Sequence, residues 1–395
     1  MHLTIVSPFP PTITGIGQYG YHITRALASS GAFSRITVLA GSKNNGEYLQ
    51  QSEITEIKYC WRPNQLNALQ EILSGIKQLR PDLVWFNVGA SVFGKSPLPN
   101  ATGLLAPMLT QYLGYPTVVT MHEMMEFSDL RALGAPGGPF AFLGARWLTK
   151  ITTQADVVCL TRAHYVNRLS ERKIDCVHIP HGAFHQPDLL PESKNPELLL
   201  FTTLAPFKGA ELLLEALPAL KLEYPDLQLT IAGEEHPRFP GYIQTLKNRF
   251  ADLQGVNWLG KIPNEEVINL FRRAQIVVIP YKASTGASSI LYQAAAWGRA
   301  VVASDIDEIR TLAHEGNFQI EFFNSANVES LKNTTRALLA SPQRRASQVQ
   351  NNFQAVQNSR IEITCQHYLH AFNRALEKRK SPNHILIPHT KSESI

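Results

Sequence analysis

Short apolar runs alternate with amphipathic stretches along most of the chain. In the first half, the runs predict six strands and the stretches between them predict four helices. The strands are expected at residues 3–7, 36–40, 83–87, 117–121, 157–160 and 177–180. The helices are expected at residues 17–29, 66–79, 102–113 and 162–172. This alternation is typical of an α/β protein with a doubly wound parallel sheet, in which ligands bind beyond the carboxyl ends of the strands.

The alternation resumes in the second half after a stretch rich in proline. Four prolines from Pro180 to Pro196, among mixed charges, predict a linker, and we place the domain boundary near residues 183–195. A strand at residues 198–202 then leads through a loop to a helix that begins near Gly209. The length of 395 residues also favours two domains over one.

The stretch from Ile276 to Asp305 is the most informative part of the chain. A buried strand, residues 276–279, is followed by a turn rich in glycine and serine. A helical pattern at residues 290–297 ends at Gly298, where a C-terminal glycine is expected, and a second apolar strand closes the unit. The arrangement is a right-handed crossover whose helix N-terminus can bind an anion. An ordinary strand–helix unit without a ligand fits the same pattern.

This stretch resembles the donor-site signature of retaining glycosyltransferases of family 4, which have the GT-B architecture. In that family the signature reads Glu-Gly-Phe-Gly, a few apolar residues, and then Glu-Ala-x-Ala-x-Gly-x-Pro-Val-Val-Ala. Seven positions of this chain fit it: Gly286, Ala294, Ala296, Gly298, Val301, Val302 and Ala303. The two glutamates are replaced by Thr285 and Gln293. Gln293 keeps an acceptor oxygen and the same length, whereas Thr285 is too short to copy a glutamate.

The resemblance spans residues 1–377 and implies two Rossmann-like, doubly wound parallel-sheet domains that face each other across a cleft. It implies that residues 1–183 form the acceptor-side domain and that residues 196–355 form the domain that binds a nucleotide sugar. Residues 356–378 are expected to form a terminal helix that crosses back to the first domain. Residues 379–395 are polar and are expected to be disordered.

The resemblance assigns a diphosphate site to the start of the second domain. Lys208 would bind the diphosphate together with backbone amides at a helix N-terminus, although a solvated lysine also fits the pattern. Thr203 stands where the family has an arginine, so one of the two usual phosphate cations is missing. Arg238 and Arg299 are candidates to replace it.

The other implied donor contacts lie in two later segments of this domain. Gly260 and Ile262 would flank the nucleotide base, and a simple turn with a core residue is the alternative. Gln293 would bind the ribose hydroxyls. The remaining donor-binding positions belong to the turn before the helix: Thr285, Gly286, Ala287, Ser288 and Ser289.

A glycine-rich loop is the first candidate site in the first domain. Gly15 and Gly17 stand where the chain leaves the first strand and opens a helix, so their amides can approach a phosphate closely. A tight turn without a ligand explains them as well. The segment GIGQYG lacks the GxGxxG spacing of a dinucleotide site, which is therefore disfavoured. The loop is similar to the family's first loop, which faces the donor diphosphate and the acceptor.

A histidine after a buried strand is the second candidate. The resemblance places His122 against the donor sugar near the reacting carbon, and a hydrogen-bonded structural histidine is the alternative. Glu123 is expected to orient the imidazole ring. The segment HEMME is not the HExxH pattern of a zinc protease, because its last position is Glu126, so we expect no metal there.

Composition narrows the class of partner. Charged residues make up 17% of the chain and the net charge is +5, which suits anionic ligands but not general nucleic-acid binding. The four cysteines lack any metal spacing, so buried thiols are expected. No apolar run approaches the roughly 20 residues of a spanning helix, and no basic leader precedes the first strand. These features indicate a cytoplasmic protein.

The stretch from Asp129 to Lys150 combines Gly-Pro hinges with aromatic residues that look exposed, namely Phe140, Phe142 and Trp147. It also carries the basic residues Arg131, Arg146 and Lys150. Plain helix packing explains the pattern. An apolar, basic surface for a lipid-linked or polymeric acceptor, or for weak peripheral association with the inner face of the membrane, explains it too.

The resemblance favours a retaining hexosyltransferase that moves a sugar from a nucleotide-diphosphate sugar to a hydroxyl acceptor. The acceptor would be a glycan, a lipid-linked compound or a small molecule, in polysaccharide, glycolipid or glycoconjugate synthesis. His122 and Lys208 would be the catalytic residues, and no metal cofactor is required because lysine and backbone amides meet the charge of the diphosphate. The alternative is a catalytically impaired GT-B binding or partner subunit of a glycan-assembly system, which the three substitutions Thr203, Thr285 and Gln293 motivate. A different GT-B chemistry, such as sugar-nucleotide epimerisation, is a third reading.

Overall fold

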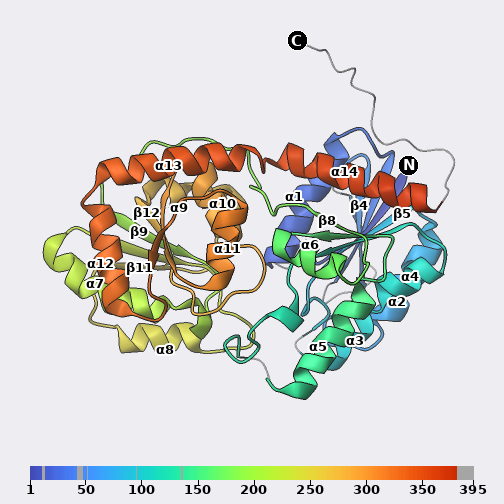
Figure 1. Ribbon diagram of the computed structural model, residues 1–395, viewed down its shortest axis with the longest axis horizontal. Helices are drawn as coiled ribbons and strands as arrows, with labels where there is room; N and C mark the ends of the chain where they lie inside the picture. The colour runs from blue at the N-terminus through green and yellow to red at the C-terminus, as the bar shows by residue number, and fades with distance from the viewer. Residues whose placement is uncertain (11–13, 42–47, 51, 95, 135–136, 380–395) are drawn as a thin grey trace, which may run out of the picture. The chain divides into compact units, whose positions relative to one another are not determined.

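The computed structural model describes residues 1–10, 14–41, 48–50, 52–94, 96–134 and 137–379 (Figure 1). The chain folds into two compact units. The first unit contains Met1–Phe127, Gly138–His181 and the C-terminal segment from Ile361. The second unit contains Ser128–Gly137 and Gly182–Arg360.

The first unit is built on a parallel sheet. Its described residues form eight strands in the order β3-β4-β2-β1-β5-β6-β7-β8, in which every pair is parallel except β3 with β4. The strands are β1 (His2–Val6), β2 (Arg35–Gly41), β3 (Tyr48–Gln50), β4 (Thr55–Trp61), β5 (Leu83–Val88), β6 (Thr117–Met121), β7 (Val157–Leu160) and β8 (Cys176–His178). The helices are α1 (Gly15–Ser29), α2 (Ala68–Leu79), α3 (Pro97–Gly103), α4 (Ala106–Tyr112), η1 (Met125–Phe127), α5 (Pro139–Thr152), α6 (Ala163–Ser170) and α14 (Ile361–Lys378).

The second unit contains a fully parallel sheet of six strands in the order β11-β10-β9-β12-β13-β14. These strands are β9 (Glu197–Phe201), β10 (Gln228–Ala232), β11 (Val256–Leu259), β12 (Ile276–Ile279), β13 (Ala300–Ser304) and β14 (Glu321–Phe323). The helices are η2 (Pro206–Lys208), α7 (Ala210–Glu223), α8 (Tyr242–Arg249), η3 (Asn264–Glu266), α9 (Val267–Arg273), α10 (Ser289–Ala296), α11 (Asp307–Glu315), α12 (Val328–Leu339) and α13 (Pro342–Gln357). Two parallel sheets with helical crossovers confirm the predicted α/β class.

Each sheet has a point at which the strand order changes direction. In the first unit the chain moves outward from β1 through β2 to β4, and then from β5 through β6 and β7 to β8. In the second unit it moves from β9 through β10 to β11, and then from β12 through β13 to β14. Ligands of open parallel sheets bind beyond the carboxyl ends of the strands at such a point. The pairs β1–β5 and β9–β12 are therefore where functional residues are expected.

Helix α14 completes the core of the first unit. The Tyr368 hydroxyl lies 2.8 Å from the Tyr19 hydroxyl and 2.9 Å from Thr120 Oγ1. Its ring packs against Trp85 and Phe372, and all of these aromatic side chains are fully buried. The C-terminal part of the chain is thus an integral part of the N-terminal sheet's core.

Three expectations about elements differ from the structure. The single helix expected at residues 102–113 is two helices, α3 and α4, because Gly103 ends the first and Pro107 lies in the first turn of the second. The terminal helix expected at residues 356–378 begins at Ile361, as α14, because α13 extends to Gln357. Strands β3 and β4 were not predicted.

The segment Ser128–Gly137 also differs from expectation, because it belongs to the second unit and not to the first. Leu133 is buried in a small cluster of second-unit side chains, with Ala205, Phe207 and Ala283 and with Phe239 packed against them. The tail beyond residue 379, which was expected to be disordered, lies outside the described residues. Of the four expected buried thiols, Cys60, Cys159 and Cys365 are buried and Cys176 is partly exposed.

Candidate functional site

The candidate donor site is built where β9 and β12 lie side by side in the second sheet. The two strands pair at Leu198 with Ile276 and at Leu199 with Val277. The loops that leave their carboxyl ends are joined by a hydrogen bond of 3.0 Å, which the buried Tyr281 hydroxyl donates to Thr202 Oγ1. The loop with Thr203 and Lys208 and the loop with Thr285 are thereby held next to each other.

Gly209 holds the turn that carries Lys208 against the end of β12. Gly209 has a φ of +70°, and a Cβ there would lie 1.9 Å from the carbonyl oxygen of Pro280. Only glycine permits this close contact between the turn before α7 and the end of β12. The half-buried Lys208 ammonium lies 3.7 Å from the centroid of the Tyr281 ring, in cation–π contact.

Two cations lie around a histidine that the sequence did not single out. The pKa of His236 is lowered to about 4, chiefly because the ring is buried and then because of the positive charges of Arg238 and Lys208. The His236 ring packs against Phe207, with centroids 5.7 Å apart, and the His236 backbone N–H donates to the Leu204 carbonyl oxygen at 2.8 Å, so the loop after β10 lies against the loop that carries Lys208. Thr203, which stands where the family has arginine, is exposed. Arg238, two residues beyond His236, is exposed on this loop and stays the candidate for the cation missing from the motif.

Arg299, the other predicted replacement, has a structural role, and that prediction was wrong. Its side chain is 1% exposed. Its guanidinium donates hydrogen bonds of 2.8 Å to the carbonyl oxygens of Leu190 and Pro191. Burial lowers the pKa of the Arg299 guanidinium. The residue anchors the linker that enters the second unit and does not reach a ligand.

The turn before α10 has the backbone geometry of an anion site. Gly286 has a φ of +69°, in the left-handed region. Ser288 is the N-cap residue of α10, but its side chain makes no capping hydrogen bond. Thr285, Ala287 and Ser289 are partly exposed. An N-terminus without a side-chain cap leaves its amide dipoles for another acceptor, which in this position suits a phosphate.

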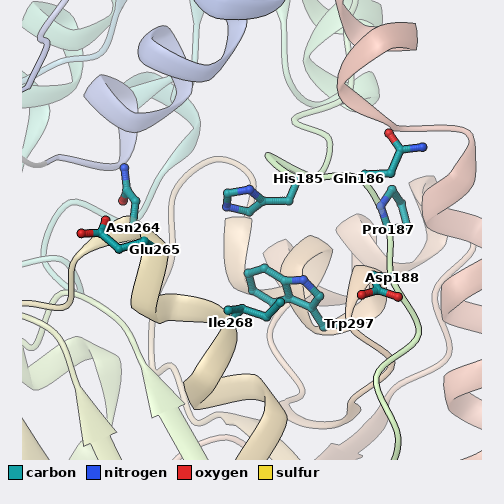
Figure 2. Close-up of a pocket in the computed structure, with 8 residues that line it drawn as sticks. All are labelled: His185, Gln186, Pro187, Asp188, Asn264, Glu265, Ile268 and Trp297. Carbon is teal, nitrogen blue, oxygen red and sulfur yellow. The ribbon is translucent and has the colours of Figure 1, made fainter.

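A pocket of about 580 Å³ lies beside the other predicted donor contacts. Figure 2 shows the residues that line it: His185, Gln186, Pro187, Asp188, Asn264, Glu265, Ile268 and Trp297. The rings of His185 and Trp297 are stacked, with centroids 5.5 Å apart. The backbone N–H of Asp188 donates to the carbonyl oxygen of Ala296 at 2.9 Å, which holds the linker against the end of α10.

The pocket adjoins two predicted positions. Trp297 stands one helical turn beyond Gln293, which is 7% exposed. Asn264 follows Ile262 by two residues, and Ile262 packs on the core while Gly260 is exposed. Sequence reasoning missed the pocket because the linker meets α10 only in the fold. The spacing of Trp297 from Gln293 was the one signal available.

His122 lies at the end of β6 in the first unit, inside a hydrogen-bonded network. Its Nε2 lies 2.6 Å from Asn87 Oδ1, and Asn87 Nδ2 donates to Ser7 Oγ and to the Ile16 carbonyl oxygen. Because Oδ1 can only accept, Nε2 carries the proton. The Tyr19 ring packs edge-on against the imidazole, with centroids 4.7 Å apart. The network connects His122 to the start of α1.

The electrostatics of His122 keep it neutral. Burial, and secondarily His181, lowers the pKa of His122 to about 3. Glu123 was predicted to orient the ring, and that prediction was wrong, since Asn87 does so and Glu123 Oε1 accepts from the Ala90 N–H at 3.0 Å. A neutral imidazole offers a lone pair on Nδ1 and has no proton to release at neutral pH.

The two predicted glycines differ in their surroundings. The Gly17 N–H donates to Thr14 Oγ1 at 2.9 Å, so Thr14 caps α1 and occupies this amide. Gly15 is exposed, and a Cβ added there would meet no atom of the described residues within 4 Å. Of the pair, Gly15 has the space for a ligand, while Gly17 maintains the helix start.

Sequence comparisons identify the second unit. Residues 195–341 match the family model described as Glycosyl transferases group 1. A phosphatidyl-myo-inositol mannosyltransferase from Mycolicibacterium smegmatis is 31% identical over 151 residues, which cover 36% of this chain and only 38% of that protein's length. A Corynebacterium glutamicum protein is 25% identical over 316 residues, covering 72% of this chain and 73% of its own length. Its name is GDP-mannose-dependent monoacylated alpha-(1-6)-phosphatidylinositol monomannoside mannosyltransferase.

Solved structures identify the fold of the whole chain. A sucrose-phosphate synthase from Thermosynechococcus elongatus has a TM-score of 0.74 at 15% identity and covers 96% of this chain and 100% of its own. HepE from Anabaena, in complex with UDP and glucose, has a TM-score of 0.70 at 15% identity, with coverages of 94% and 99%. The chain therefore has the GT-B fold. The match of residues 195–341 to the group 1 model and the mannosyltransferase relatives confirm the resemblance to glycosyltransferases of family 4.

No helix among the described residues is long and apolar enough to cross a membrane.

Proposed function

We propose that the protein is a retaining hexosyltransferase that uses a nucleotide-diphosphate sugar and transfers the sugar to a hydroxyl acceptor. The observation that carries this proposal is the Lys208 ammonium held 3.7 Å from the ring of Tyr281, whose hydroxyl joins the loop after β12 to the loop after β9 at the carboxyl ends of the two central strands. The names of the mannosyltransferase relatives support a GDP-linked hexose as the donor and a phosphatidylinositol-linked hydroxyl as the acceptor.

In this proposal the leaving diphosphate is stabilised by fixed charges and dipoles. Negative charge grows on the diphosphate as its bond to the sugar breaks. Lys208, Arg238 and the amides of the turn from Thr285 to Ser289 meet that charge, and no metal cofactor is needed. Each such donor contributes about 2–4 kcal/mol to the transition state. Arg238 thus compensates for Thr203.

The pocket of Figure 2 accommodates the nucleoside in this proposal. Gln293 binds the ribose without charge assistance, and the base lies between the segment of Gly260 and Ile262 and the Trp297 ring. Aromatic rings and apolar walls with a few polar groups are typical of small-molecule sites. His122 contacts the sugar as a neutral partner, because burial lowers its pKa to about 3 and the imidazole is therefore uncharged near pH 7.

A turnover assay tests the proposal. Purified protein is incubated with GDP-mannose or UDP-glucose and phosphatidylinositol vesicles, with and without EDTA, and the anomeric product is assigned by NMR. Lys208→Ala is expected to lower kcat by about 10²–10³-fold, and the control Lys194→Ala is expected to leave it unchanged. Loss of activity with EDTA would contradict a metal-free reaction. A product with inverted anomeric configuration would contradict a retaining mechanism.

The positions of Lys208 and Arg238 can be tested without an activity assay, through the pKa of His236. Arg238→Gln and Lys208→Gln are expected to raise the pKa of His236 from about 4 towards its ordinary value, because each removes a positive charge from its surroundings. Histidine NMR titration measures the change, with Lys282→Gln as the control. If the pKa of His236 were unchanged in both variants, Arg238 would not belong to the site.

A partner subunit without transferase activity is the second candidate, which the substitutions Thr203, Thr285 and Gln293 favour. Calorimetry separates the two. Binding of GDP or UDP that Lys208→Ala weakens supports the enzyme, whereas no heat with either nucleotide supports the partner subunit.

A further inference from the structure

Helix α5 turns its large apolar side chains outward. Phe140, Leu143 and Trp147 are 90%, 58% and 52% exposed, and their spacing of three and four residues places them on one face. The side chains that α5 buries are mostly small: Ala145, Thr149, Ile151 and Thr152. A helix that served only to pack on its own unit would bury the aromatic residues instead. Figure 1 shows α5 on the periphery of the first unit.

The polar positions around this face are basic. Arg146 and Lys150 are exposed on α5 itself. Residues 130–155 contain no aspartate or glutamate. Two helices that contact α5 are α4, which has no acidic residue and ends with Tyr112 exposed by 75%, and η1, whose Glu126 is buried and paired with Arg172. The surface therefore combines interfacial aromatic residues with positive charge and has no negative charge of its own.

This chemistry fits one occupant best. Aromatic rings and leucine enter the region between lipid headgroups and acyl chains, and nearby lysine and arginine bind anionic headgroups. A second copy of the chain docked symmetrically on the same face would bring Arg146 and Lys150 against the same cations. We propose that α5 docks the protein on an anionic lipid bilayer, with Phe140, Leu143 and Trp147 inserted at the interface. The inference goes beyond the proposed transferase activity and does not depend on it.

Vesicle co-sedimentation of the full chain tests this. Binding to phosphatidylglycerol vesicles is expected to exceed binding to phosphatidylcholine vesicles and to weaken with added salt. The double variant Phe140→Ser/Trp147→Ser is expected to bind phosphatidylglycerol at least about tenfold more weakly. Arg146→Gln/Lys150→Gln is expected to lose the preference for the anionic lipid. Leu222→Ser is the matched control, because Leu222 is 86% exposed on α7 of the second unit.

Two further measurements keep the result unambiguous. The tryptophan emission of the wild type is expected to shift to the blue on vesicles, and Trp147→Phe is expected to abolish the shift while most of the binding remains. Because the substituted residues are exposed, each variant should keep the wild-type Tm. Equal binding of wild type and Phe140→Ser/Trp147→Ser would overturn the proposal. So would a wild-type dimer that this double variant dissociates without any change in vesicle binding.

Discussion

In the proposed donor site, one residue takes over a task that the family motif gives to another. The motif places an arginine at the position of Thr203, whereas the proposed replacement, Arg238, lies on the loop after β10, where His236 packs against Phe207 next to Lys208. Arg299 lies within the signature itself, but its guanidinium donates hydrogen bonds to the carbonyl oxygens of Leu190 and Pro191. The position of an arginine in the motif therefore does not show whether it serves the donor site; its contacts in the folded chain do.

The burial of His122 makes a prediction about stability and pH. Its pKa is about 3 in the folded chain and about 6.5 when unfolded, so below pH 6.5 the unfolded chain binds a proton that the folded chain does not. The resulting contribution to stability is complete above pH 6.5 and is lost progressively as the pH falls towards 3. His122→Gln should therefore reduce the slope of the unfolding free energy by about 1.4 kcal/mol per pH unit between pH 6 and 4. Urea unfolding at several pH values measures this, and parallel curves for the two proteins would contradict it.

At the level of elements, the turn between β9 and α7 carries a strict backbone requirement in the candidate donor site. Gly209 combines a positive φ with direct contact to the backbone of Pro280. The turn therefore sets both the start of α7 and the distance between the Lys208 loop and the loop after β12.

Two glycine substitutions separate these requirements. Gly241→Ala meets a φ of +86° in open space, so it should cost about 1–2 kcal/mol of unfolding free energy from the backbone alone. Gly209→Ala meets a φ of +70° and also a carbonyl oxygen at 1.9 Å, so it should cost about 1–3 kcal/mol more. Denaturant unfolding compares the two variants. Equal losses would show that the contact with Pro280 relaxes freely.

The sequence predicted those elements that one strong local signal defines. Three strands have the predicted bounds, namely Thr117–Met121, Val157–Leu160 and Ile276–Ile279, because each is a short run of β-branched and apolar residues that is buried on both faces. Strand β4 (Thr55–Trp61) was missed because polar and apolar residues alternate in its first half, near the edge of the sheet.

In the candidate site, too, the sequence predicted the features that a local pattern defines and missed those that depend on the fold. The sequence predicted Lys208, Gln293 and the turn at Gly286 from a local pattern. It did not predict the closeness of His236 to Lys208, or the stacking of His185 on Trp297, because each joins segments that only the fold brings together.

On the scale of the whole molecule, neither core is made from a continuous stretch of chain. The chain leaves the first unit after Phe127, returns at Gly138, leaves again after His181 and returns at Ile361. Each unit nevertheless has its own parallel sheet and its own buried clusters. We therefore expect the two units to unfold independently of each other, although their segments are interleaved in sequence.

Paired truncations in the two cores test that independence. Tyr368→Ala removes a fully buried ring and its hydrogen bonds to Tyr19 and Thr120, and should destabilise the first unit by about 3–5 kcal/mol. Leu217→Ala removes a fully buried side chain under the second sheet and should cost about 2–5 kcal/mol there. Hydrogen exchange should accelerate in β1, β5 and β6 for the first variant and in β9 and β10 for the second. If both variants accelerated exchange in both sheets to the same extent, the two cores would unfold as one cooperative unit, and the interleaving of the chain would be the reason.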